Sequence, residues 1–337
     1  MKIAVDGRWI FAEISGIGHY AREVLKHLGR IDRVNEYAVL FDNAEVARRT
    51  WQDAELGVAG NMTSVQVGYG LFSPANQVAL PLWLRRHGID VYHAPNYMIP
   101  FPAFPRRRPG RVRCVVTIHD VIPLLFPDHA PRSRKTRFFA LYRWVMQEVG
   151  RRADAVITVS EQSRQDTIGQ LRIGRMQQSW VRSIHNGVSE GFFPPPDQPS
   201  DGARKRSILY VGRADPYKNL TGLIRAFARL RELCPAPVVL QVAGSPDSRY
   251  PEAPSLAREL GVEEGIEWLG YLSDDDLRKA YQDADALAHP SLYEGFGLQV
   301  LEAMACGTPV VCSDRGSLPE VAGDAALLVD PENTESL

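Results

Sequence analysis

The sequence alternates short, continuous apolar runs with segments of helical pattern. In the first half, such runs occupy residues 2–5, 37–41, 65–67, 91–93, 114–118, 155–159 and 180–184. A second series begins at Ile208 and continues at residues 238–243, 266–269, 284–288, 309–312 and 326–329. Strands that are apolar at successive positions are buried on both faces, which is typical of parallel sheets covered by helices. We therefore predict an α/β protein with two doubly wound, Rossmann-like domains.

A proline-rich and then polar segment separates the two series. It spans residues 191–206 and has the composition of a linker. The 337 residues of the chain are enough for two domains that each have a core. We predict an N-terminal domain at 1–190, a linker at 191–206 and a C-terminal domain at 207–337. A cleft between two such domains is a preferred place for a ligand.

Composition excludes several classes of protein. The net charge is −1 and the pI is near 6.7, so nothing points to a nucleic-acid partner. No apolar run approaches the roughly 20 residues of a membrane-spanning helix, and the N-terminus resembles a first strand more than a signal peptide. The four cysteines lack metal-site spacing. We expect reduced, mostly buried thiols in a cytoplasmic protein.

The stretch Pro290–Pro309 predicts a strand, a glycine-containing loop and a helix. Glu294 lies in the loop and Glu302 in the helix, with Gly295 and Gly297 between them. The N–H groups at a helix N-terminus can bind phosphate, and carboxylates accept hydrogen bonds from sugar hydroxyls. Taken alone, such a pair of acids is more often an ordinary loop–helix junction.

Two cations change that interpretation. Arg213 and Lys218 lie in the loop after the first strand of the second domain, at the carboxyl edge of its sheet. Single cations of this kind are usually surface charges. Beside a helix N-terminus and two glutamates, however, they could stabilise a diphosphate leaving group.

In the first domain, Gly16 and Gly18 open a helix. A dinucleotide site is not favoured, because no third glycine has the required spacing and a long loop separates the pair from the strand. Glycines here could let a ligand approach the backbone. His119 and Asp120 end the fifth apolar run, where a base or a hydroxyl-orienting group could lie. The alternative is a structural histidine bonded to the backbone.

Arginines gather in two clusters, one at residues 106–108, 111 and 113 and one, with a lysine, at 132, 134, 135 and 137. An aromatic stretch at 138–144 follows the second cluster. Charge runs are usually solvated loops. The functional alternative is a surface for anionic lipid or a lipid-phosphate acceptor, which we assign to Arg132, Arg134 and Lys135.

In combination, these motifs resemble glycosyltransferase family 4, whose members are retaining enzymes of the GT-B fold. The similarity is carried by G-I-G-H-Y, T-I-H-D, H-N-G-V, V-G-R-x4-K-N and H-P-S-x-Y-E-G-F-G-L-x-x-L-E-A-M-A-x-G-x-P-V. It spans nearly the whole chain. The opening M-K-I-A-V-D-G-R, with G-I-G-H-Y, is similar to bacterial mannosyltransferases of lipopolysaccharide O-antigen or exopolysaccharide synthesis.

The resemblance implies roles for individual residues. Arg213 and Lys218 would hold the donor diphosphate. Glu302 would bind the ribose hydroxyls of the nucleotide, and Glu294 would contact the donor sugar. His119 would lie beside the transferred sugar.

Further roles implied by the resemblance concern backbone and acceptor groups. N–H groups along the sugar and phosphate would come from Gly295, Phe296, Gly297 and Leu298. Gly16 and Gly18 would form a loop facing the diphosphate. Asp120 and Asn186 would shape the acceptor side or the domain junction.

The resemblance also implies a reaction. A sugar, with mannose from GDP-mannose as the leading choice, would pass with retention to a saccharide or lipid-linked acceptor, and the enzyme could contact an anionic membrane peripherally. No cofactor or metal is expected. Asp274–Asp276 has D-x-D spacing, but it follows Ser273 and reads as the first turn of a helix. The alternatives are a GT-B nucleotide-sugar 2-epimerase and a non-catalytic sugar-nucleotide-binding subunit.

The C-terminus departs from the family pattern. Family members usually continue for some tens of residues with helices that pack back on the first domain, whereas this chain stops at Leu337. We therefore expect a truncated or incomplete sequence.

Overall fold

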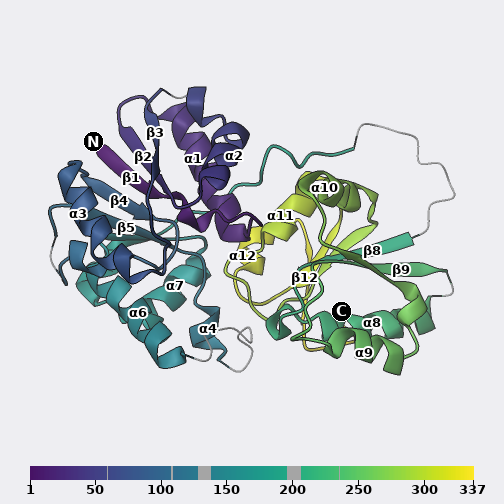
Figure 1. The fold of residues 1–337 in the computed structure, drawn as a ribbon. Coiled ribbons are helices and arrows are strands. Elements are labelled where there is room, and N and C mark those ends of the chain that lie inside the picture. Colours follow the sequence, from purple (N-terminus) through teal and green to yellow (C-terminus); the bar gives the residue numbers. More distant parts are fainter. Residues whose placement is uncertain (59, 108, 128–137, 196–205, 235) are drawn as a thin grey trace. The chain divides into compact units, whose positions relative to one another are not determined.

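The computed structural model describes residues 1–58, 60–107, 109–127, 138–195, 206–234 and 236–337, and Figure 1 shows its fold. The chain divides into two compact units, Met1–Val121 with Phe138–His185, and Ile122–Arg137 with Asn186–Leu337. Each unit is built on one parallel sheet. The prediction of an α/β protein with two Rossmann-like sheets is confirmed.

The first sheet has seven strands in the order β3-β2-β1-β4-β5-β6-β7. Their bounds are β1 Lys2–Asp6, β2 Glu36–Phe41, β3 Met62–Gln66, β4 Val91–Ala94, β5 Arg113–Ile118, β6 Ala155–Thr158 and β7 Val181–Ser183. All neighbouring strands pair in parallel. Apolar residues at successive positions, such as Val39, Leu40 and Phe41 of β2, are all buried, because helices cover both faces.

The helices of the first unit connect these strands. They are η1 Gly7–Trp9, α1 Gly16–Ile31, α2 Ala44–Asp53, η2 Leu56–Val58, η3 Pro74–Gln77, α3 Ala79–Arg86, η4 Phe101–Ala103, α6 Phe139–Arg152, α7 Glu161–Gln170 and η5 Arg175–Trp180. Helices α1 and α2 cover one face of the sheet, and α3 and α6 cover the other (Figure 1). This division follows from right-handed crossovers that change direction after β3.

The second sheet has six parallel strands in the order β10-β9-β8-β11-β12-β13. Their bounds are β8 Arg206–Val211, β9 Val238–Ala243, β10 Ile266–Gly270, β11 Ala286–His289, β12 Val310–Ser313 and β13 Leu327–Val329. The helices are η6 Pro216–Lys218, α8 Leu220–Leu233, α9 Glu252–Glu259, η7 Glu263–Gly265, α10 Asp274–Asp283, α11 Leu298–Ala305 and α12 Leu318–Ala322. Two apolar clusters form the core, one with α8 and α9 and one with α10, α11 and α12.

The second unit also includes a short helix from the first half of the chain. Helix α4, Ile122–Leu125, follows β5 in sequence, but Ile122 packs with Tyr217 and Tyr293. The ring of Phe126 lies 5.5 Å from that of Tyr293. The sequence-based division at residue 190 placed α4 in the first domain. A local sequence pattern does not reveal the aromatic surface on which α4 packs.

The first residues of the predicted linker are likewise attached to the second unit. Gln282 of α10 donates a hydrogen bond of 2.7 Å to the carbonyl of Phe193. The guanidinium of Arg278 lies 4.8 Å from the centre of the Phe193 ring. Residues 196–205 of the linker lie outside the described part of the chain.

Both sheets reverse their strand order at one point. In the first sheet this switch point lies between β1 and β4, and in the second it lies between β8 and β11. In open α/β sheets, ligands bind outside the carboxyl ends of the strands at such a point. The second switch point therefore marks where to look for a ligand site in that unit.

Two further expectations concern membranes and thiols. Among the described residues, no helix has both the length and the apolar character that crossing a bilayer requires. All four cysteines are free thiols; Cys114, Cys306 and Cys312 are buried and Cys234 is half-buried. The expectation that the thiols are mostly buried is confirmed.

Candidate functional site

The second switch point brings Lys218 and Glu294 together. Lys218 ends η6, in the connection after β8, and Glu294 lies in the loop after β11. The Lys218 ammonium donates to Glu294 Oε1 at 2.7 Å, and both side chains are largely buried. Two residues predicted to share a site are thus in direct contact, although 76 positions separate them.

His289 is a further member of this cluster to which sequence reasoning assigned no role. It is the last residue of β11, and its Nε2 lies 3.1 Å from Glu294 Oε1. Because an ionised carboxylate only accepts hydrogen bonds, Nε2 carries the proton. The signal was the position of His289 at the carboxyl end of a strand beside the glutamate motif.

Glu294 is held in its ionised form. Burial by itself would raise its pKa, but the charge of Lys218 and the hydrogen bond from His289 outweigh burial and hold the pKa below its ordinary value. Burial lowers the pKa of Lys218, but the charge of Glu294, the nearby Tyr217 and the hydrogen bond to Glu294 together raise it above its ordinary value. Both contacts use Oε1, so Oε2 is the oxygen that could accept a ligand hydroxyl.

Arg213 lies beside this cluster in sequence and follows β8. Its guanidinium is 56% exposed and contacts the carboxylate of Asp215 at 2.7 Å, while that carboxylate is only 1% exposed. Burial would lower the pKa of Arg213, but Asp215 and Tyr217 raise it. Asp215, which the sequence analysis did not single out, anchors the arginine and leaves part of its donor fork open to solvent.

The loop between Glu294 and α11 is fixed by its own backbone. Gly297 has φ +95°, and a Cβ at this position would lie 2.5 Å from Leu318. Ser317 donates to the carbonyls of Glu294 and Phe296, both at 3.0 Å. Since a left-handed residue precedes the helix, only glycine fits here without strain. The predicted backbone contacts, from Gly295, Phe296 and Gly297 to Leu298 at the start of α11, belong to this loop.

Glu302 lies in the second turn of α11. The hydroxyl of Tyr281 donates to its Oε2 at 2.8 Å. Burial raises the pKa of Glu302 to about 7, and the Tyr281 hydrogen bond opposes that shift only in part. Without a bound ligand, this carboxyl group therefore changes charge near neutral pH.

In the first unit, His119 lies just after β5. Its Nε2 donates to the carbonyl of Pro95 at 2.9 Å, and the Tyr20 ring meets its ring edge-on at 4.7 Å. Burial lowers the pKa of His119, so the imidazole is neutral near pH 7. The bond to the backbone is the structural alternative considered above. It also fixes the tautomer in which Nδ1 can accept a hydrogen bond.

A buried polar chain supports His119, and sequence reasoning missed it. Thr117 Oγ1 lies 3.0 Å from the Tyr20 hydroxyl and 2.9 Å from Nε2 of His93. Burial, together with the neighbouring His119, lowers the pKa of His93 to about 4. The signal was that His93 also ends a strand, β4, next to β5 in the sheet.

The remaining predicted residues have varied surroundings. Gly16 and Gly18 lie in the first turn of α1, whose N-cap Ser15 accepts from the Gly18 N–H. Gly16 faces open space, whereas Gly18 packs on the backbone of Trp9. Asp120 is half-buried.

Asn186 follows β7 and begins the second unit. Its buried Oδ1 has no hydrogen-bond partner in the described part of the chain. Asp274–Asp276 form the first turn of α10, and Ser273 accepts from the Asp276 N–H. The interpretation of these aspartates as a helix start is confirmed.

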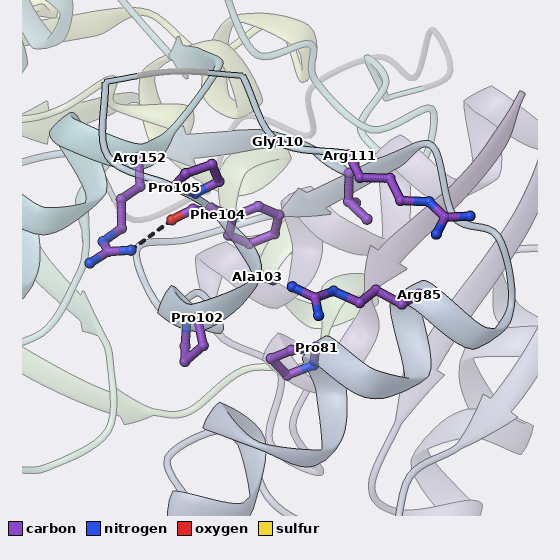
Figure 2. A pocket seen from close by; sticks show the side chains of 10 residues that line it. Pro81, Arg85, Pro102, Ala103, Phe104, Pro105, Gly110, Arg111 and Arg152 are labelled. Atoms are coloured by element: carbon purple, nitrogen blue, oxygen red, sulfur yellow. Dashed lines mark hydrogen bonds between the residues drawn. The ribbon is translucent and has the colours of Figure 1, made fainter.

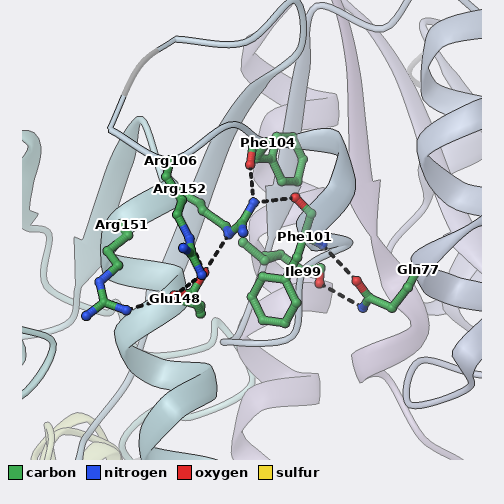
Figure 3. A network of polar contacts seen from close by, with 8 residues as sticks. All are labelled: Gln77, Ile99, Phe101, Phe104, Arg106, Glu148, Arg151 and Arg152. Carbon is green, nitrogen blue, oxygen red and sulfur yellow. Dashed lines mark hydrogen bonds and ion pairs between the residues drawn. The ribbon is translucent and has the colours of Figure 1, made fainter.

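The first arginine cluster is partly structural. Figure 3 shows Arg106, Arg151 and Arg152 around Glu148, which is fully buried and accepts from each of them at 2.8–2.9 Å. Arg113 pairs with Asp154 at 2.9 Å. Arg108 and the predicted lipid-contacting residues Arg132, Arg134 and Lys135 lie outside the described residues.

Two protein-family models match the chain. The model described as Glycosyltransferase Family 4 matches residues 14–192, and the model described as Glycosyl transferases group 1 matches residues 197–337. The boundary between the two matches falls within the predicted linker.

Several relatives match over much or all of the sequence. O-antigen chain mannosyltransferase B of Escherichia coli is 30% identical over 372 aligned residues, which cover 100% of this chain and 88% of the relative. MMP alpha-(1->4)-mannosyltransferase of Mycolicibacterium hassiacum is 32% identical over 66% of this chain and 54% of its own length. Serotype-specific mannosyltransferase WbdA of Escherichia coli is 29% identical over 73% of this chain and 30% of its own length.

Solved structures share the fold. Sucrose-phosphate synthase from Thermosynechococcus elongatus has a TM-score of 0.74 at 20% identity, covering 100% of this chain and 87% of that structure. Anabaena HepE, solved with UDP and glucose, has a TM-score of 0.71 at 21% identity with the same coverage. At these identities the likeness establishes the two-sheet architecture and not the substrate.

Proposed function

The chain belongs to glycosyltransferase family 4, and on this premise we propose that it transfers mannose from GDP-mannose to a saccharide or lipid-linked acceptor. The product would contribute to a cell-surface polysaccharide, such as lipopolysaccharide O-antigen or an exopolysaccharide. The observation that carries the proposal is the contact of Lys218 and His289 with Glu294, beside the half-exposed Arg213, at the switch point of the second sheet. The mannosyltransferase relatives support the choice of sugar.

The cations suit a diphosphate leaving group. As the bond between the anomeric carbon and the phosphate oxygen breaks, negative charge grows on the phosphate. Arg213 can offer two parallel N–H donors, and Lys218 offers a compact charge. We propose that the acceptor oxygen bonds to the same face of the sugar while its proton passes to the leaving phosphate oxygen. This route retains configuration and needs no nucleophilic carboxylate.

The two glutamates would have separate tasks. Glu294 stays ionised and can accept a hydroxyl of the donor sugar through Oε2, while Lys218 and His289 hold its orientation. Glu302 would accept both ribose hydroxyls once it is ionised. We further assign His119 to the transferred sugar and Asp120 and Asn186 to the acceptor side.

The proposal includes no cofactor and no metal ion, because Arg213, Lys218 and the start of α11 would supply the positive charge. Transfer should then proceed at an unchanged rate in excess EDTA. A rate that falls in EDTA and recovers with Mg²⁺ or Mn²⁺ would refute this part of the proposal. Peripheral contact with an anionic membrane at its cytoplasmic face would bring the enzyme to a lipid-linked acceptor.

A donor panel tests the substrate. Calorimetry with GDP-mannose, UDP-glucose, UDP-galactose, UDP-N-acetylglucosamine and dTDP-rhamnose should show tightest binding of GDP-mannose. The anomeric configuration of the product, measured by NMR, should equal that of the donor. Preference for a UDP sugar would replace the proposed donor, and an inverted product would refute the mechanism.

Substitution tests the site itself. Lys218→Ala and Glu294→Ala should each abolish transfer while the protein still unfolds cooperatively. Arg229→Gln is the matched control, since Arg229 is exposed in the same unit and pairs with Glu232 and Glu335. Near-normal turnover in both alanine variants would remove the basis of the proposal.

Two alternatives are separable in the same assay. A 2-epimerase would convert UDP-N-acetylglucosamine without any acceptor, so incubation of that donor alone should give no new sugar nucleotide. A non-catalytic subunit would bind the donor without turnover. The second alternative is not favoured, because the chain has every residue that is predicted to act in transfer. These residues are Arg213, Lys218, Glu294, Glu302 and His119.

A further inference from the structure

A cavity of about 320 Å³ lies in the first unit, on the face of the sheet that α3 and α6 cover. Figure 2 shows its lining. The wall combines apolar and cationic groups, which are Pro81, Arg85, Pro102, Ala103, Phe104, Pro105, Gly110, Arg111, Val112 and Arg152. No lining residue is acidic. The cavity is distinct from the His119 region, because Arg85, Arg111 and Arg152 precede the amino ends of β4, β5 and β6.

Two of the three guanidinium groups in the wall are available for a ligand. Arg152 is engaged, since it donates to Glu148 and to the carbonyls of Phe101 and Phe104. Arg85 and Arg111, in contrast, have no side-chain partner among the described residues, and both are exposed. Their guanidinium N–H groups are therefore open to a ligand. Planar, forked donors of this kind match phosphate oxygens.

The charge around the cavity is strongly one-sided. In the described part of segments 79–89, 99–112 and 138–153, Glu148 is the sole acid. The same segments carry Arg85, Arg86, Arg106, Arg107, Arg111, Arg143, Arg151 and Arg152. The whole chain has a net charge of only −1, so the excess is local. Such a surface attracts a polyanion or an anionic membrane.

Exposed apolar side chains adjoin the cavity. On α6, Leu141 is 57% and Trp144 is 47% exposed, and they lie three positions apart on one helical face. The Trp144 ring packs edge-to-face on Phe101 at 5.8 Å, and the Arg152 guanidinium lies 5.6 Å from the same Phe101 ring. The aromatic residues are therefore continuous with the cationic wall.

Exposed apolar side chains also lie on α3 and just before it. Val78 and Leu82 are exposed, and Leu82 follows the lining residue Pro81 on α3. Helix η4 packs against both α3 and α6. We call the surface formed by α3, η4 and α6 the basic–apolar face. Aromatic and aliphatic side chains beside arginines are what an interfacial membrane contact requires, whereas a polyanion in water would not need them.

We propose that the basic–apolar face docks on an anionic lipid surface, with lipid phosphates bound by Arg85 and by Arg111 and with Trp144 and Leu141 in the interface. The proposal rests on the proposed function for its purpose, which is to hold the enzyme where a lipid-linked acceptor lies. It is independent of the predicted contact through Arg132, Arg134 and Lys135, which lie outside the described residues.

Vesicle sedimentation tests the charge. Wild-type protein should bind vesicles that contain phosphatidylglycerol and not vesicles of phosphatidylcholine alone, and added salt should weaken binding. Arg85→Gln with Arg111→Gln should weaken binding about thirtyfold, at about 1 kcal/mol for each arginine. Arg48→Gln with Arg229→Gln, which removes the same charge elsewhere, should weaken it less than about threefold. Equal losses in both double variants would overturn the proposal.

A second arm tests insertion. Trp144→Ser should weaken vesicle binding, whereas Met176→Ser should not, although Met176 is 92% exposed in the same unit. Inorganic phosphate distinguishes the source of the ligand. If phosphate alone raises the thermal midpoint at millimolar concentration while vesicles fail to bind, the cavity is a soluble-phosphate site and the membrane proposal is wrong.

The membrane proposal and the proposed function can fail independently of each other. Vesicle binding needs no donor, and calorimetry with GDP-mannose can be run on the same variants. Arg85→Gln with Arg111→Gln should leave GDP-mannose affinity unchanged. A protein that binds anionic vesicles but not GDP-mannose would refute the donor assignment and leave the basic–apolar face intact.

Discussion

The two sheets reverse their strand order in the same way, yet their switch points hold different chemistry. At the first, Arg8 and Asp6 form a fully buried pair at 2.7 Å, and the Tyr92 hydroxyl also donates to Asp6. At the second, Arg213 is half exposed and the Lys218–Glu294 pair retains some access to solvent. At the first switch point the charged side chains pair with one another, whereas at the second the cationic side chains keep N–H donors that a ligand can reach.

This difference shows that topology alone does not make a binding site. Both sheets provide carboxyl strand ends that could face a ligand. In the first unit, the Arg8 guanidinium donates hydrogen bonds to Asp6 and to Asn76 Oδ1, the latter at 2.9 Å, so these donors are not available to a ligand. The M-K-I-A-V-D-G-R motif therefore has a structural role at this point. The exposure of the cation, and not its presence, separates the two switch points.

The largest effect is expected from breaking the closed pair. Arg8→Met leaves the Asp6 carboxylate buried without its cation, which should lower the free energy of unfolding by about 3–5 kcal/mol. Urea unfolding followed by circular dichroism measures this loss. Arg48→Met, which removes an exposed arginine from α2, should have little effect. A loss for Arg8→Met below about 1 kcal/mol would mean that the first switch point is not held by this pair.

The next effect concerns Glu302 and pH. Its pKa is raised from 4.5 to about 7 in the folded protein, so between these values the folded state holds a proton that the unfolded state has lost. The stability associated with this group is therefore fully present below pH 4.5 and is lost as pH rises through 7. The shift corresponds to at most about 3 kcal/mol.

Glu302→Gln should remove that pH dependence, because its amide stays neutral throughout. Urea unfolding at pH 5 and pH 8 should show wild type losing more stability than the variant over this interval. GDP affinity of the wild type should rise over the same interval, since ionised Glu302 accepts the ribose hydroxyls. Parallel stability profiles for both proteins would contradict a raised pKa.

Much of the architecture could be predicted from local pattern. A run such as Val238–Ala243 is apolar at most positions, and the structure has a strand with the same bounds. The stretch around Glu294 likewise predicted strand, loop and helix, and α11 begins at Leu298 as expected. Period and capping residues determine such elements locally, so they are visible in the sequence.

Contacts between distant segments could not be predicted in this way. Tyr281 positions Glu302 although 21 residues separate them, and only the folded sheet creates that pairing. His289 and Asp215 are close in sequence to Glu294 and Arg213, but their residue types alone do not show which charge each will contact. The packing of α4 on the second unit and the capture of Arg106 by Glu148 are of the same kind. A run of arginines in the sequence does not show which of them will form an ion pair with a carboxylate in the folded protein.

A pair of glycines sharpens the comparison between the switch points. Gly297→Ala should destabilise the protein by roughly 1–3 kcal/mol, since φ is +95° and the new Cβ would meet Leu318. Gly16→Ala should be neutral or stabilising, because Gly16 lies in a helix and faces open space. Thermal unfolding measures both changes. Reduced transfer by a stable Gly16→Ala variant would support the predicted approach of a diphosphate to Gly16, and unchanged transfer would count against it.

The smallest effect on stability is expected at Arg213. Because its guanidinium is 56% exposed, Arg213→Gln should change the free energy of unfolding by only about 1 kcal/mol, and the new amide can still donate to Asp215. Its effect on ligand binding should be larger, since a charged donor pair to phosphate is lost, and GDP affinity should fall about tenfold or more. Calorimetry and urea unfolding on one preparation measure both quantities, with Arg229→Gln as the control. A variant that loses stability like Arg8→Met but keeps its affinity for GDP would show that Arg213 too is a structural cation, and the contrast between the two switch points would fail.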